Sequence, residues 1–226
     1  MDVTYILVLV AALFSIWASI RVNTTYNKYE KVRSMSGLTG AMAAERILHS
    51  QGIYDVRVEH VSGKLTDHYD PSAKVLRLSD STYGSSSVAA VGVAAHECGH
   101  ALQHAQAYSM LQLRSALVPV VSFASHWVQW ILLAGILLVD TFPNLLLIGI
   151  ALFAMTTLFS IITLPVEIDA SHRALAWLRN SGITTYESQE SAKDALKWAA
   201  YTYVIAALSS LATLLYYIMI YLGRRE

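Results

Sequence analysis

The sequence is poor in charged residues and almost free of cysteine. Only 14% of its 226 residues are Asp, Glu, Lys or Arg, whereas a soluble domain usually carries about 25%. Hydrophobic residues make up 55% of the chain, and this excess indicates a membrane protein. The single cysteine, Cys98, excludes an intramolecular disulfide. Sixteen basic residues balance sixteen acidic ones, and the lack of a basic excess argues against a nucleic-acid-binding surface.

Four apolar runs approach or exceed the length that a helix needs to cross the ~30 Å hydrocarbon core of a bilayer. They cover residues 4–20, 116–139, 145–166 and 199–222. The first run lacks a basic n-region and a small-residue cleavage site, so it predicts an uncleaved anchor rather than a signal peptide. Only Asp140 to Asn144 separates the second run from the third, which predicts an antiparallel hairpin. We therefore expect four transmembrane helices with both termini on one face.

Basic residues are distributed unevenly around the ends of these runs. The membrane face opposite the two long polar segments has only two basic residues near the span ends, Arg224 and Arg225. By the positive-inside rule, the two polar segments are expected in the cytoplasm. The basic residues that they hold near the span ends are Arg21, Lys28, Lys31, Arg33, Arg114, Arg173, Arg179, Lys193 and Lys197.

These patterns divide the chain into five parts. We expect a transmembrane anchor over residues 1–20, a soluble α+β segment over 21–115, a transmembrane hairpin over 116–166, a polar helical segment over 167–198, and a transmembrane helix with a short tail over 199–226.

The segment 21–115 carries its own secondary-structure signals. They predict a helix over residues 38–51, strands near 56–60 and 75–78, and a helix over 88–107 that the serines before it can cap. The stretch Lys74 to Ser79 could serve as an exposed edge strand that binds the backbone of a substrate by strand addition, or simply pack within the sheet.

The second of these helices carries two histidines four residues apart. This spacing puts the imidazoles of His96 and His100 on one face, one turn apart, where both can bind one zinc ion. Glu97 lies beside His96 and can act as a general base without being a ligand. Cys98 is directed away from this face, and we interpret it as a small buried residue rather than as a ligand or nucleophile.

A catalytic zinc site requires a third protein ligand and an open fourth position. The favoured candidate is Glu167, which lies just after the third apolar run and emerges on the same membrane face as the two histidines. His68 in the preceding loop is an alternative. His104 is another, but its Cβ would lie about 12 Å from that of His96 at 1.5 Å rise per residue.

The chemistry expected of such a site is peptide hydrolysis. Zinc would lower the pKa of a bound water, and Glu97 would accept its proton and return it to the leaving amine. A second donor to the oxyanion could come from His172, Arg173 or Tyr201, which the sequence does not rank. Asp169 is either a partner that orients a ligand histidine or a solvated charge.

Three stretches of this sequence together resemble the YugP-like family of membrane-bound neutral zinc metallopeptidases. They are His96 to His104, Asp67 to Pro71 and Leu164 to Ser171. The resemblance covers essentially the whole chain and implies a bacterial multi-pass inner-membrane protein with one zinc ion. A more distant likeness to HtpX and the CAAX prenyl proteases implies a glutamate as third ligand. Those relatives have an Asp at the position of Ser171, which puts Asp169 in doubt as the orienting partner.

The resulting expectation is a mainly α protein with four transmembrane helices and a small α+β zincin-like (gluzincin-type) metallopeptidase domain on one membrane face. It would hydrolyse protein or peptide substrates at the cytoplasmic face. The alternative is a non-catalytic zinc-binding membrane adaptor that acts as a scaffold for a partner complex. Glu97 favours the enzyme, because a structural zinc site has no need of a base and usually has four protein ligands.

A third interpretation, a metal transporter, would require polar residues within the spans. His126 and Gln129 are the main candidates, but we prefer hydrogen bonding between helices as their role. The substrate, the oligomeric state and any membrane-protein partner are left open by the sequence.

Overall fold

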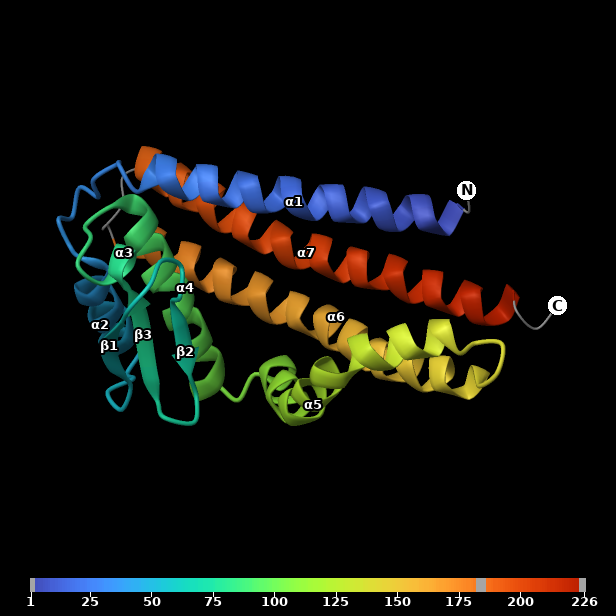
Figure 1. The fold of residues 1–226 in the computed structure, drawn as a ribbon. Coiled ribbons are helices and arrows are strands. Elements are labelled where there is room, and N and C mark those ends of the chain that lie inside the picture. The colour runs from blue at the N-terminus through green and yellow to red at the C-terminus, as the bar shows by residue number, and fades with distance from the viewer. Residues whose placement is uncertain (1–2, 182–185, 224–226) are drawn as a thin grey trace. The chain divides into compact units, whose positions relative to one another are not determined.

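The computed structural model describes residues 3–181 and 186–223, and this part of the chain is mainly helical (Figure 1). Its helices are α1 (Val3–Tyr29), α2 (Gly40–Ser50), α3 (Asp80–Tyr83), α4 (Val88–Ala105), α5 (Ser109–Leu137), α6 (Pro143–Asn180) and α7 (Tyr186–Gly223). Its strands are β1 (Arg57–Val61), β2 (His68–Asp70) and β3 (Val75–Ser79).

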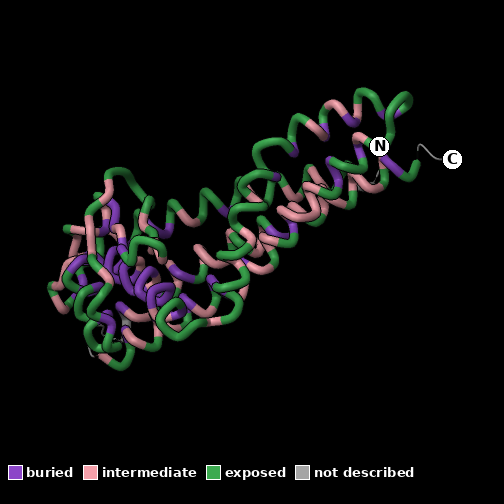
Figure 2. Tube along the Cα trace, turned by 90° about the horizontal axis from the view of Figure 1, so that it is seen from below, coloured by how far each residue is buried: buried purple, intermediate pink, exposed green. Residues whose placement is uncertain are grey.

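The chain divides into two compact units. The first, here called the helical unit, comprises Met1–Ala18, Gln112–Leu164 and Thr202–Glu226. The second, here called the mixed unit, comprises Ser19–Leu111 and Pro165–Tyr201 and contains the sheet. Figure 2 shows that buried positions crowd together in the mixed unit, whereas exposed and intermediate positions prevail along the long helices.

Within the described residues, four helices are long and apolar enough to cross a membrane by length and composition. They are α1, α5, α6 and α7. The expected architecture of four apolar helices and a small sheet is therefore confirmed. Arg224 and Arg225, on which the charge comparison in part rests, lie outside the described residues. The helices are longer than the apolar runs, and α6 continues without a break through Pro165. Residues 167–180 are thus helical in continuity with the third apolar run, and they belong to the mixed unit.

The helical unit is held together by close contacts between its helices. Gly135 on α5 lies so near the α6 backbone that a Cβ there would come within 2.7 Å of the Cα of Leu146. The hydroxyl of Ser15 on α1 meets that of Ser209 on α7 at 3.1 Å. Such polar contacts tie helices together where no water competes.

The mixed unit packs helices α2 and α4 and the second half of α6 around one apolar core. The Ser87 hydroxyl caps α4 by accepting a hydrogen bond from the Ala90 N–H. Thr39 caps α2 in the same way, through the N–H of Met42. Alanines, which occupy little volume, let α2 and α4 pack closely, and they are prominent in the shared core cluster.

The sheet has the strand order β1–β3–β2, with β1 parallel and β2 antiparallel to β3. Of the two alternatives for Lys74 to Ser79, packing within the sheet is the one that the structure shows, because β3 is the central strand and both of its sides are paired. Its neighbour β2 was not anticipated, since the turn-forming residues Asp70 and Pro71 concealed so short a strand. Helix α3 was also missed.

Candidate metal centre

Helix α4 presents His96 and His100 side by side. Their ring centroids lie 4.8 Å apart with an interplanar angle of 83°. Both rings lie on one face because four residues span about one helical turn. His100 is buried and His96 is nearly so, which removes much of the water that would otherwise hydrate them.

Helix α6 comes unusually close to this part of α4. Gly99, between the two histidines on the helix, lies against Ala170 on α6, where a Cβ would come within 2.6 Å of the Ala170 carbonyl oxygen. The absence of a side chain at Gly99 permits this approach. It brings Glu167, three residues earlier on α6, to the histidine face.

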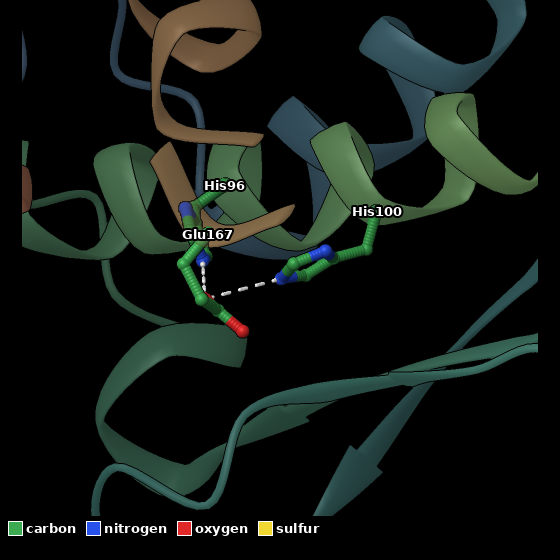
Figure 3. Close-up of side chains that lie close together, drawn as sticks. All are labelled: His96, His100 and Glu167. Carbon is green, nitrogen blue, oxygen red and sulfur yellow. Dashed lines mark hydrogen bonds and ion pairs between the residues drawn. The ribbon is translucent and has the colours of Figure 1, made fainter. Parts of the chain in front are cut away.

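The three side chains converge on one point (Figure 3). The Glu167 Oε2 lies 3.3 Å from His96 Nε2 and 3.5 Å from His100 Nε2. One ligand atom from each residue lies within 4.8 Å of the others. Zinc–nitrogen bonds of ~2.0–2.1 Å in a tetrahedron put neighbouring ligand atoms ~3.3 Å apart. The two separations that involve the Glu167 oxygen are close to this edge length.

The electrostatics of this cluster also favour a cation. Glu167 is 2% exposed, and a buried carboxylate is costly unless a positive charge compensates it. Burial lowers the pKa of His100, but the hydrogen bond to Glu167 and the charges of Glu97 and Glu167 outweigh this, so that the net shift of its pKa is upward. The negative charge beside His100 thus favours a positive charge at this point, which a bound metal ion would supply.

Glu97 lies next to His96 on α4 and is buried, at 8% exposure. Within residues 3–181 and 186–223, no hydrogen bond or ion pair engages its carboxylate. A partner-free carboxylate beside the histidine pair is available to accept a proton.

The outer nitrogens of both rings have partners. The Nδ1 of His96 lies 3.1 Å from the Ser171 hydroxyl, and the Nδ1 of His100 lies 3.1 Å from the Gln103 Oε1. Gln103 was not singled out from the sequence, although its place three residues after His100 on a helix could have suggested a contact. Asp169 contacts Gln103 rather than a histidine, at 2.7 Å.

The other sequence candidates lie elsewhere. His68, on β2, has its Nδ1 2.8 Å from the Thr66 carbonyl oxygen, and the His104 Nδ1 is 2.8 Å from the Tyr69 hydroxyl. Burial, together with nearby acidic groups, raises the pKa of Tyr69 to about 12, so this phenol stays neutral. Neither histidine belongs to the converging cluster found among the described residues.

The three candidate oxyanion donors have different surroundings. Arg173 is held by hydrogen bonds to Asp169 and to Gln106. Tyr201 packs edge-on against Trp198. His172 is exposed to solvent.

Cys98 is buried within the core of the mixed unit. Its Sγ lies 3.6 Å from the carbonyl oxygen of Ala44 on α2. It therefore lies apart from the cluster of ligand atoms, in the orientation that its helical position predicted.

Comparison with known proteins identifies the family of the chain. The family model described as "Putative neutral zinc metallopeptidase" matches residues 4–222. The chain belongs to this family. It is also 46% identical over 223 residues to the "Putative membrane protease YugP" of Bacillus subtilis (strain 168), covering 98% of each chain. No solved structure matches the chain.

Membership of the neutral zinc metallopeptidase family confirms the resemblance seen in the sequence. The family description implies zinc and a protein or peptide substrate, and the relative is a membrane protease by name. These statements agree with the four apolar helices and with a cluster whose donor atoms, two imidazole nitrogens and a carboxylate oxygen, are ligands that zinc prefers.

Proposed function

We propose that this protein is a zinc metalloendopeptidase in which His96, His100 and Glu167 hold one zinc ion and Glu97 is the general base. The observation that carries the proposal is the convergence of two Nε2 atoms and one carboxylate oxygen, with the Glu97 carboxylate close enough to act electrostatically on His100. Three protein ligands leave the fourth tetrahedral position open, as in catalytic zinc sites. A small gluzincin-type domain, with its third ligand a glutamate, is the fold class that this ligand set supports.

The roles of the chain's own residues follow from their positions. Bound zinc would lower the pKa of a water molecule to about 7 and polarise the peptide carbonyl. Glu97 accepts a proton from the attacking water and then donates it to the departing amine, which allows the C–N bond to break. The buried surroundings of Glu97 and His100 exclude bulk water and so strengthen the electrostatic interactions with the developing charge.

We also propose the arrangement of the chain in a bacterial inner membrane. Helices α1, α5, α6 and α7 would span the bilayer, and the mixed unit would lie on the cytoplasmic side. The excess of Lys and Arg in segments 21–115 and 167–198 supports this orientation through the positive-inside rule. A protease cleavage site inserted at the exposed turn after Asp70 should be cut only by protease on the cytoplasmic side. Cleavage by protease added outside the cell would contradict this orientation.

The decisive experiment measures zinc content and cleavage of an unfolded protein by the purified protein in detergent. We expect Glu97→Gln to keep zinc but to lose cleavage by several orders of magnitude, since it removes only the base. Glu167→Ala should lose zinc, because two histidines alone bind it weakly. Glu45→Gln is the matched control, since Glu45 is exposed on α2 and remote in sequence from the cluster.

Three results would contradict the proposal. If Glu97→Gln kept full cleavage, Glu97 would not be the base. If Glu167→Ala kept full zinc occupancy, the third ligand would lie elsewhere. If the wild-type protein bound zinc yet cleaved nothing in detergent or in membranes, a zinc-binding adaptor would replace the enzyme.

A further inference from the structure

Gln103 is a fully buried amide at the back of the candidate metal centre. It is 0% exposed, and it lies on α4, three residues after His100. Its Nε2 lies 2.8 Å from the Val166 carbonyl oxygen and 2.7 Å from Asp169 Oδ2. Its Oε1 lies 3.1 Å from His100 Nδ1. All of its polar atoms thus have partners, as a buried amide requires.

These partners leave only one orientation for the amide. A carbonyl oxygen and a carboxylate oxygen accept hydrogen bonds but never donate them, so the atom that faces Val166 and Asp169 must be the NH2 group. The atom that faces His100 is therefore an oxygen, which can only accept. His100 must then carry a hydrogen on Nδ1, and in the neutral ring the lone pair is left on Nε2.

The consequence concerns the metal ligand. We propose that Gln103 is a positioning residue that fixes the Nδ1–H tautomer of His100 and so presents Nε2 as the zinc-binding atom. This proposal rests on the zinc site described under the proposed function. Ligand histidines commonly donate the other ring N–H to a carboxylate or a carbonyl oxygen. Here the amide oxygen of Gln103 is the acceptor for the ring N–H of His100. The NH2 group of the same amide donates hydrogen bonds to Val166 and Asp169 on α6.

The same amide joins the two helices that carry the ligands. Val166 and Asp169 flank Glu167 on α6, so Gln103 connects one ligand's ring to the backbone beside another ligand. His96 lacks an equivalent constraint. Its Nδ1 faces the hydroxyl of Ser171, which can donate or accept and therefore does not select a tautomer.

Two substitutions separate a positioning role from a structural one. Gln103→Leu has a similar volume but offers no acceptor to His100, so zinc should bind about 10–100-fold more weakly. Gln103→Glu keeps an acceptor for the His100 N–H while losing the donors to α6, and it should restore zinc binding to within about 10-fold of wild type. Gln51→Leu, at an exposed glutamine that ends α2, is the control and should match wild type.

The measurements are zinc affinity by competition with a chromophoric chelator and the imidazole signals of the zinc-loaded, 15N-histidine-labelled protein in detergent. Wild type and Gln103→Glu should each show a protected Nδ1–H resonance for His100, and Gln103→Leu should not. Signals of the two ligand rings are recognised because they disappear when zinc is chelated. Ser171→Ala distinguishes them, since it perturbs only the His96 ring.

The possible results divide clearly. If Gln103→Leu lowered thermal stability but kept zinc affinity and the His100 resonance, Gln103 would be structural only and the inference would be overturned. If Gln103→Glu failed to restore either property while remaining folded, the acceptor would not be the essential feature. If the wild-type protein bound no zinc, both this inference and the proposed function would fail. Zinc binding without cleavage would affect the proposed function alone.

Discussion

Gly99 and Ala170 lie in direct backbone contact between α4 and α6. A Cβ built on Gly99 would come within 2.6 Å of the Ala170 carbonyl oxygen and 3.0 Å of its Cα. Both atoms belong to a helical backbone, so neither can rotate away as a flexible side chain would. Since Ala170 follows Glu167 by less than one helical turn, this contact sets how closely the carboxylate approaches the histidines.

Gly99→Ala should therefore damage the metal centre without touching a ligand. The added methyl group would force α6 away from α4 and displace Glu167 from the two imidazoles. We expect weaker zinc binding and a fall of about 10²-fold in cleavage, since a displacement near 1 Å can cost that much. Zinc titration and a peptidase assay on the purified variant measure both effects.

Gly92→Ala is the matched control, because Gly92 lies on the same helix seven residues before Gly99. A Cβ there would lie 3.7 Å from the Ala192 side chain, an ordinary packing distance. Alanine is favoured over glycine in a helix by about 1 kcal/mol, so this variant should be at least as thermally stable as wild type. If both variants kept wild-type zinc affinity, the close approach at Gly99 would not position Glu167.

Cys98 should be inert although it lies inside the metal motif. Burial raises the pKa of its thiol well above the ordinary value, and the charge of Glu97 raises it further. The thiolate is the reactive form, so N-ethylmaleimide should modify the folded protein very slowly and the denatured protein rapidly. Mass spectrometry over time measures the two rates.

Cys98→Ala provides the complementary measurement. It should retain zinc content and cleavage, because its Sγ contacts the Ala44 carbonyl oxygen and not the ligand cluster. Loss of zinc in a variant that remains folded would make Cys98 a ligand.

The sequence predicted those parts of the site that depend on local spacing. His96 and His100 share a face because a helix repeats every 3.6 residues, and Ser87 marks where that helix begins. Glu167 was favoured because it emerges on the same membrane face as the histidines, and because a carboxylate at the membrane edge is energetically costly unless it is paired or exposed. The spacing of Gln103 from His100 allows a contact between them, but nothing local shows that this glutamine is buried against α6 rather than placed on a solvated helix face.

Long-range pairing explains what the sequence left open in the fold. Whether β3 is an edge or a central strand depends on β1 and β2, which a local alternation of residues does not reveal. Hydropathy placed the end of the third apolar run at residue 166, and Pro165 nearby lacks an N–H and disfavours helix before it. Helix α6 nevertheless continues, since neighbouring elements can stabilise a helix around one missing hydrogen bond.

Ser171 should matter less to zinc binding than Gln103. Ser171→Ala removes the hydroxyl that contacts His96 Nδ1, but that hydroxyl does not select a tautomer. We expect zinc affinity to fall by no more than about 10-fold, at the lower limit for partners of ligand histidines. Chelator competition measures it, with Ser72→Ala in an exposed turn as the control. A loss larger than that of Gln103→Leu would reverse the order of importance.

Stability and zinc binding should respond to pH in opposite directions. In the metal-free protein, the pKa of His100 is raised above its ordinary value of 6.5, because the hydrogen bond to Glu167 and nearby negative charges outweigh burial. The protonated ring then stabilises the fold below the unfolded-state pKa, and this contribution is lost as pH rises through the folded-state pKa. Zinc competes with the proton for the same ring, so its affinity should increase as pH rises.

Thermal unfolding of chelator-treated and zinc-loaded protein from about pH 5 to pH 9 separates the two trends, since this interval brackets histidine titration. The stabilisation conferred by zinc should be small in acid and grow as pH rises, while the His100 contribution to the metal-free protein declines. His100→Gln should remove that contribution, seen as the difference from wild type at each pH, and His49→Gln, at an exposed histidine on α2, should not. If zinc stabilised the protein equally at both ends of the range, protons would not compete at His100, and this ring would not be a zinc ligand.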